Sequence, residues 1–179
     1  MNQEQTHQES DRHVVELLTI ATEYFRFLEN IDSIPVEDFI LFIRKISSLL
    51  YCKGMLFPVT EEPDNTGNER FVTEEQWESI FNSIRAKLGS DDEFTYMARN
   101  EGVEEMTKGS IAEMLADVYQ DMKDFALLLT KPSQLAYENG VYEIRRLFDT
   151  HWGIRLAVIM QVLHSRTLVQ EEDAIDLDW

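Results

Sequence analysis

The chain has 179 residues, of which 44% are hydrophobic, and its 16 basic and 34 acidic side chains give a formal net charge of −18. This length fits one domain of about 100–200 residues, and a core of that size needs neither a disulfide nor a structural metal. The negative charge disfavours direct binding to nucleic acid or to an anionic membrane surface, because like charges repel. The acidity either keeps the chain soluble or attracts a basic or neutral protein partner.

The single cysteine, Cys52, excludes an internal disulfide and is consistent with a reducing cytoplasm. Residues 1–10 are rich in Gln and Glu and have no apolar stretch, so we expect a disordered lead-in rather than a signal peptide. The longest apolar stretch, residues 39–43, is far shorter than the roughly 20 residues of a membrane-spanning helix. We therefore predict a cytoplasmic helical domain over residues 11–168, followed by an acidic tail over residues 169–179.

Two helices are predicted in the first third of the chain. The first runs over residues 10–30, where apolar side chains recur at three- and four-residue steps and share one face. A turn at residues 31–35 ends with Pro35, whose fixed backbone angle suits a helix start. Apolar side chains occupy most of the circumference of the second helix, so we expect it to be the central one, with Cys52 buried near its end.

Residues 56–72 contain two prolines and an Asn-Thr-Gly sequence, which is typical of a long and mobile connection. The third helix is expected to begin at Thr73, where Gln76 three residues later completes a capping box. Gly89 is expected to end this helix. Local signals therefore define both ends of the third helix.

Residues 90–109 are charged and only patchily apolar, with no strand-like alternation, so the one element predicted there is a short helix over residues 94–100. The fourth helix is expected to open at Ser110, with Glu113 forming a second capping box. It must stop before Pro132, because proline cannot continue a helix.

The last helix is predicted to begin between residues 134 and 141 and to continue to about residue 168. Gly140 and Gly153 are weak points, because a glycine inside a helix costs about 1 kcal/mol relative to alanine. We expect a kink at one of them. Together the elements predict an all-α fold, a single-domain bundle of five or six helices.

The side chains most informative about function lie on the last two of these helices. His151 and Arg155 fall inside the apolar arc of the last helix, and a buried guanidinium needs a partner because its isolated burial is costly. Three carboxylates form one acidic strip on the fourth helix: Asp117, Asp121 and Asp124. We expect Asp121, at the edge of the apolar arc, to meet His151 or Arg155 across a helix interface.

Two interpretations of these residues are open. In the first, the groups form a buried network that fixes helix register, and the chain is a non-enzymatic module that contacts another protein through its acidic surface or tail. In the second, the chain is a small-ligand- or metal-binding enzyme with a site between the fourth and fifth helices. Arg155 would clamp an anion, and His151 would act as acid or base. Asp117 and Asp121 would hold a divalent cation. We favour the first.

Familiar catalytic signatures are missing from the sequence: it has no Gly-rich phosphate loop, no His-Glu-x-x-His, no cysteine pair and no Gly-x-Ser-x-Gly. A metal site would also need a second histidine on the same face, and His164 falls on a different side of the helix from His151. We therefore assign no catalytic residue, cofactor or metal. The partner expected is a protein, and the residues do not indicate an oligomeric state.

Three strings of residues together resemble a known family: LLYCKGMLFP after the second helix, LADVYQDMKDF in the fourth and FDTHWG…LH in the last. They are similar to a bacterial family described as a domain of unknown function, over residues 14–164. The resemblance implies an all-helical fold. It carries no activity, cofactor or catalytic residue to this chain.

Overall fold

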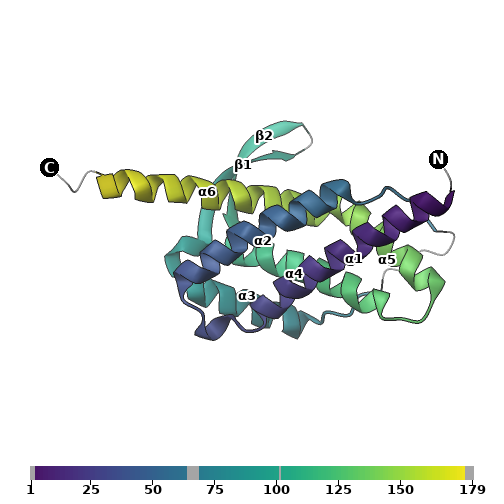
Figure 1. The fold of residues 1–179 in the computed structure, drawn as a ribbon. Helices are drawn as coiled ribbons and strands as arrows, with labels where there is room; N and C mark the ends of the chain where they lie inside the picture. The colour runs from purple at the N-terminus through teal and green to yellow at the C-terminus, as the bar shows by residue number, and fades with distance from the viewer. Residues whose placement is uncertain (1–2, 64–68, 101, 176–179) are drawn as a thin grey trace.

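The computed structural model describes residues 3–63, 69–100 and 102–175, with side chains described within 11–63, 69–98 and 102–166. It confirms an all-α bundle, to which one small hairpin is added (Figure 1). The elements in chain order are α1 (Gln3–Leu28), η1 (Ile31–Ser33), α2 (Val36–Leu56), α3 (Glu74–Leu88), η2 (Gly89–Asp92), β1 (Glu93–Asn100), β2 (Val103–Ser110), α4 (Ile111–Leu129), α5 (Gln134–Leu147), η3 (Phe148–Trp152) and α6 (Gly153–Ile175).

The central helix of the bundle is α4, which packs against α1, α3, α5 and α6. Its side chains Leu115, Val118 and Met122 are fully buried. The sequence-based assignment of the central place to α2 is wrong, because Leu41 and Leu49 of α2 are 47% and 51% exposed. Helix α2 packs on α1 along one side and on α6 along another. Part of its apolar circumference therefore stays open to solvent.

The predicted limits of α3 are confirmed. Thr73 Oγ1 accepts a hydrogen bond from the Gln76 amide at 3.2 Å, and the Gln76 side chain accepts one from the Thr73 amide at 3.1 Å. Gly89 ends the helix with a φ of 56°, in the region that glycine adopts without steric cost.

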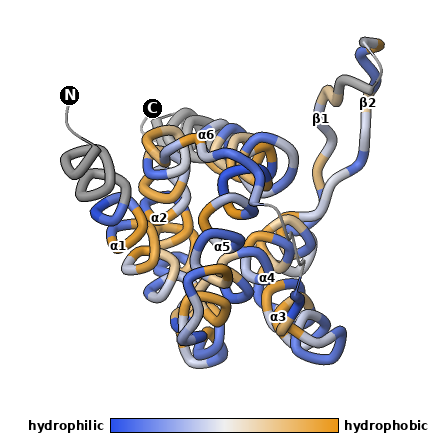
Figure 2. The backbone as a smooth tube through the Cα atoms, turned by 90° about the vertical axis from the view of Figure 1, so that its right-hand side faces the viewer, coloured by the Kyte–Doolittle hydropathy of each residue, from blue (hydrophilic) through white to orange (hydrophobic). Residues whose placement is uncertain are grey.

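The short helix predicted for residues 94–100 is wrong, because this segment is strand β1 of an antiparallel hairpin with β2. Asn100 pairs with Val103 at the end of the hairpin, and Gly102 has a φ of 85°, in the region that favours glycine. Phe94 and Tyr96 are two residues apart and so lie on the same face of β1, with ring centroids 5.6 Å apart. The hairpin extends away from the helices in two views (Figures 1 and 2).

The base of the hairpin is fastened to the start of α4. Asp92, which is buried, accepts hydrogen bonds from the Ala112 amide at 2.7 Å and from Ser110 Oγ at 2.8 Å. Ser110 Oγ in turn accepts from the Glu113 amide at 3.0 Å, which is one half of the predicted capping box. The hairpin is therefore anchored at its root, although it projects beyond the bundle.

The long last helix is interrupted by the π-helical turn η3, which separates α5 from α6. The break directly precedes Gly153, one of the two predicted weak points, while Gly140 remains inside α5. A side chain at Gly153 would place its Cβ only 2.3 Å from the carbonyl oxygen of Phe148. Trp152 is fully buried and donates to the carbonyl of Ile144 at 3.0 Å, which fixes the turn against α5.

The chain ends differ from the predicted domain limits. The lead-in over residues 1–10 was expected to be disordered, yet α1 is helical from Gln3 onward. Helix α6 continues to Ile175, into the predicted acidic tail, and residues 176–179 lie outside the described part of the chain. Cys52 is exposed on α2, contrary to its predicted burial. Within the described ranges, no helix is long and apolar enough to cross a bilayer.

Candidate functional site

The predicted meeting of polar groups between the last two long helices is confirmed in its geometry. Asp121 Oδ2 lies 2.5 Å from His151 Nδ1. Arg155 Nε donates to Asp117 Oδ2 at 2.7 Å, so the guanidinium pairs with Asp117 rather than with Asp121. Asp117 and Asp121 are one turn apart on α4, and His151 and Arg155 are one turn apart across the junction of η3 and α6. The two contacts therefore lie one helical turn apart along the same interface.

A further cation, which sequence reasoning missed, joins this interface from the connection before α3. Arg70 Nη1 lies 3.2 Å from Asp121 Oδ1 and 3.3 Å from Asp124 Oδ2. The other oxygen of Asp124 accepts hydrogen bonds from the amides of Phe71 and Val72, each at 2.8 Å. Arg70 sits in a connecting segment without helical periodicity, so no pattern in the sequence indicated where its side chain points.

The groups brought together will be called the charged cluster. It consists of Arg70, Asp117, Asp121, Asp124, His151 and Arg155. Among its carboxylates, Asp121 and Asp124 have side chains only 1% and 8% exposed. Burial lowers the pKa of Arg70, but its hydrogen bonds to Asp121 and Asp124 outweigh that effect and raise the pKa above the ordinary value. Arg70 therefore stays positively charged beside the buried acids.

Each carboxylate of the charged cluster accepts from more than one protein donor. Asp117 accepts from Arg155 and also from the Trp77 indole Nε1–H of α3, at 3.0 Å. Asp121 contacts both His151 and Arg70. The contacts tie α3, α4, α6 and the connection before α3 to one another. A buried polar network stabilises a fold when its polar groups have hydrogen-bond partners, as these carboxylates do.

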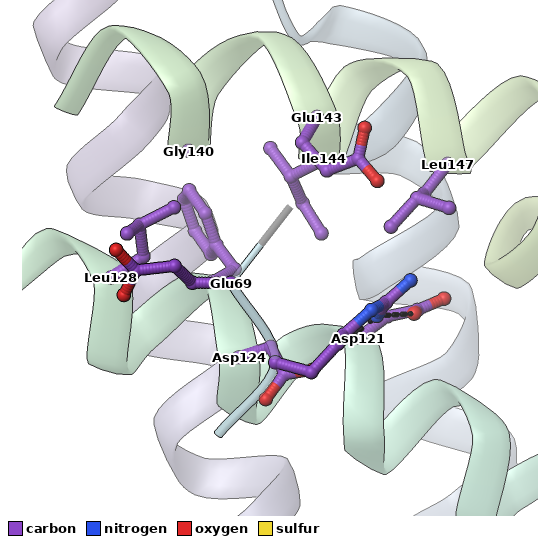
Figure 3. A pocket seen from close by; sticks show the side chains of 10 residues that line it. Glu69, Asp121, Asp124, Leu128, Gly140, Glu143, Ile144 and Leu147 are labelled. Carbon is purple, nitrogen blue, oxygen red and sulfur yellow. Dashed lines mark hydrogen bonds and ion pairs between the residues drawn. The ribbon is translucent and has the colours of Figure 1, made fainter. Parts of the chain in front are cut away.

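A small cavity borders the cluster between α4 and α5 (Figure 3). Asp121 and Asp124 lie on its α4 side, and Glu143 and Ile144 on its α5 side. Its volume, taken as the space open to the centre of a water molecule, is about 30 Å³. That is room for one or two waters rather than for a substrate. Within the described residues, no group of three or more His, Cys, Asp or Glu side chains is placed to hold a metal ion.

A larger cavity of about 200 Å³, lined in part by Arg155, lies at the root of the hairpin. Lys108 and Tyr96 of the hairpin line it together with Asp117 and Glu113 of α4. Its charged lining groups thus have both signs, and the two that belong to the cluster, Arg155 and Asp117, are paired with each other at 2.7 Å.

The largest of the three hollows, about 920 Å³ by the same measure, is an open groove between α2 and α6. This α2–α6 groove is lined by Leu41, Arg44, Lys45, Ser48, Leu49, Met160, Gln161 and His164. His164 therefore lies away from the charged cluster, as its helical position predicted. Sequence reasoning missed the groove because it treated α2 as buried on nearly all sides.

The charges of the α2–α6 groove differ from those of the two cavities beside the cluster. Among the side chains that the structure describes, no carboxylate lines it, and neither Arg44 nor Lys45 forms an ion pair. On the same helix, Lys53 does find an acidic partner, because its Nζ lies 2.7 Å from Glu16 of α1. Among the side chains that the structure describes, the groove therefore combines apolar residues with two cations that form no ion pair.

The fold has a relative of known structure. The crystal structure of protein BF1032 from Bacteroides fragilis matches this chain with a TM-score of 0.75 and 30% sequence identity, over 86% of this chain and 91% of that one. No curated protein matches the sequence. A family model described as "Domain of unknown function (DUF5063)" matches residues 8–168, which run from α1 into α6 and include the whole charged cluster and the groove. The chain belongs to this family.

Proposed function

We propose that this chain is a non-enzymatic, cytoplasmic protein-interaction module that binds an acidic, amphipathic helix in the α2–α6 groove. The observation that carries the proposal is a pair of cations, Arg44 and Lys45, that form no ion pair with any described side chain and lie beside exposed leucines in a chain whose net charge is −18.

The apolar part of the groove supports a helical partner. Leu41 and Leu49 are about half exposed, and they lie eight residues apart on α2, close to two turns of helix and the same face. Met160 lines the groove from α6, and its sulfur lies 3.6 Å from Ser48 Oγ of α2. A groove between two helices suits the apolar face of a third helix, whose contacting side chains recur every three or four residues.

The charged part of the groove supports an acidic partner. With 34 acidic side chains against 16 basic ones, most described lysines and arginines find a carboxylate within the chain itself. Arg44 and Lys45 instead remain open to an external carboxylate, which would steer association and fix orientation. The net charge alone suggested a basic or neutral partner, but the local charge of the groove favours the opposite sign.

The test uses two labelled peptides of equal length, each helical with leucines along one face, one carrying glutamates elsewhere and the other lysines. Fluorescence anisotropy should show that the full chain binds the glutamate peptide and not the lysine peptide. The double variant Arg44→Glu/Lys45→Glu should weaken binding by about tenfold or more, since reversing two rim charges makes the contact repulsive.

The matched control for this test is Arg26→Glu/Lys108→Glu. Among the described side chains, Arg26 and Lys108 also form no ion pair, so the double reversal changes net charge equally while leaving the groove intact. Equal losses in the two double variants would mean that general electrostatics, and not the groove, attracts the peptide. Failure of the monomeric chain, whose groove is free, to bind the glutamate peptide would overturn the proposal.

A second candidate function, small-ligand binding, rests on the cavity of about 200 Å³ beside Arg155. Lys108 in its wall would contact an anionic group of such a ligand. A thermal-melt screen against divalent metals, nucleotides and small carboxylates tests this candidate, because a ligand that binds only the folded state raises the melting temperature. A shift that disappears in a folded Lys108→Ala variant would favour ligand binding over the interaction module.

A further inference from the structure

We propose that the α2–α6 groove is filled by residues 169–179 of a second copy of this chain, so that the protein forms a reciprocal dimer. This inference rests on the proposed function, because it names the occupant of the same groove.

The sequence of this segment has the chemistry that the groove requires. Five of its side chains are acidic and none is basic: Glu171, Glu172, Asp173, Asp176 and Asp178. Its large apolar side chains are Val169, Ile175, Leu177 and Trp179. The segment is thus acidic and apolar, whereas the groove is basic and apolar, and opposite charges across an interface favour the correct pairing.

The direction of α6 determines which copy can supply the segment. Helix α6 forms one wall of the groove through Met160, Gln161 and His164, and it then continues as a helix to Ile175. With a rise of about 1.5 Å per residue, the eleven residues from His164 to Ile175 carry the backbone about 16 Å farther along the same axis. Figure 1 shows this end of α6 extending beyond the other helices. Residues 169–175 belong to the same continuous helix that borders the groove, and a continuous helix cannot fold back onto its own side, so these residues can reach such a groove only on another molecule.

In a dimer with a two-fold axis across α6, both grooves can be filled at once. Two antiparallel α6 helices that cross near their last turns would each carry the segment 169–179 toward the partner's groove. The arrangement is self-complementary and closes as a dimer, since each copy gives one segment and receives one. It would cover Leu41 and Leu49 of both copies, which are exposed in the single chain.

The test is a charge swap followed by sedimentation velocity on the full-length chain. One variant, Arg44→Glu/Lys45→Glu, has an acidic groove and an acidic segment. The other, Glu171→Lys/Glu172→Lys/Asp173→Lys, has a basic groove and a basic segment. The unchanged chain should sediment as a dimer, each variant alone as a monomer, and an equimolar mixture as a dimer again, because both contacts become complementary in the mixed pair.

The control variant Arg26→Glu/Lys108→Glu should remain dimeric, and circular dichroism should show that all variants are folded. A monomeric unchanged chain, a dimer that persists in either groove or segment variant, or a mixture that stays monomeric would each overturn the inference.

The proposed function is tested separately on the segment variant, whose groove residues are unchanged. If that variant binds the glutamate peptide while the unchanged chain is monomeric, the interaction function stands and only the second copy fails as its occupant. If it does not bind the peptide, the groove itself is not a binding site.

Discussion

The charged cluster and the α2–α6 groove differ in how their cations are paired. In the cluster, Arg70 and Arg155 each meet a carboxylate, and the carboxylates are further satisfied by backbone amides and an indole. In the groove, Arg44 and Lys45 form no ion pair with any described residue and lie beside half-exposed leucines. Polar groups that already contact one another hold the fold together, whereas those left open are available to a partner.

This contrast separates residues that catalytic patterns would group together. His151 beside a buried aspartate looks like a proton-transfer pair, but that aspartate, Asp121, also contacts Arg70. One helical turn away, Arg155 pairs with Asp117. The groove contains a histidine as well, His164, without any carboxylate among its described lining. We therefore expect substitutions in the cluster to change stability and substitutions in the groove to change association.

The largest effect is expected for Asp124→Ala. This change would leave two amides, those of Phe71 and Val72, without their acceptor and would remove one of the two acids that pair with Arg70. Each buried donor left without an acceptor costs about 1–3 kcal/mol, so the loss of both should lower the unfolding free energy by about 2 kcal/mol or more. Urea denaturation measures this loss.

Asp149→Ala is the matched control for Asp124→Ala. Asp149 has a side chain 58% exposed and pairs with Arg145 one helical turn away, so its loss should cost less than about 1 kcal/mol. A cost for Asp124→Ala no greater than that of the control would contradict the structural role of the cluster.

The next effect is the coupling between Asp117 and Arg155. A double-mutant cycle with Asp117→Ala and Arg155→Ala should give a coupling energy of about 1–3 kcal/mol, because each single change removes the same contact. The cycle between Asp121 and Arg155 should give a smaller value, since Asp121 pairs with His151 and Arg70. The reverse order would mean that the guanidinium has a different partner in solution.

A third effect concerns acid stability at the contact between α1 and α2. Hydrogen bonds from Lys53 and Arg12 lower the pKa of Glu16 from 4.5 to about 2. A depressed carboxyl pKa stabilises the folded state above the unfolded value of 4.5, and this contribution is lost as the pH falls toward 2. Urea titrations between these pH values should therefore show a shallower decline for Glu16→Gln. An unchanged slope would remove Glu16 from the acid response.

The smallest effect is expected in the groove. Arg44→Ala and Lys45→Ala should each change the unfolding free energy by less than about 0.5 kcal/mol, because neither side chain forms an ion pair within the described part of the chain. The comparison belongs in the Glu171→Lys/Glu172→Lys/Asp173→Lys background, so that dimer formation does not add to apparent stability. A loss above 1 kcal/mol would place these cations among the residues that hold the fold, as in the cluster.

Helical periodicity and capping signals sufficed to predict most of the bundle and the meeting of Asp121 with His151, because both depend on local spacing. The hairpin could not be predicted that way: its strands are mostly exposed, as Val103 and Met106 show, so no buried face imposes an alternation on the sequence. Arg70 was missed because its position depends on how a connection crosses α4. The groove was missed because the apolar side chains of α2 predicted a helix buried on most sides, whereas only α1 and α6 pack closely on it and part of its surface stays exposed.

The central claim is that association depends on the groove and not on the cluster. Binding of the labelled glutamate peptide should be measured by anisotropy for Arg44→Glu/Lys45→Glu and for His151→Gln, each in the Glu171→Lys/Glu172→Lys/Asp173→Lys background and each confirmed to be folded. The account predicts a loss of about tenfold or more for the groove variant and a change of less than about twofold for His151→Gln. Full binding by the groove variant, together with a clear loss in folded His151→Gln, would contradict it.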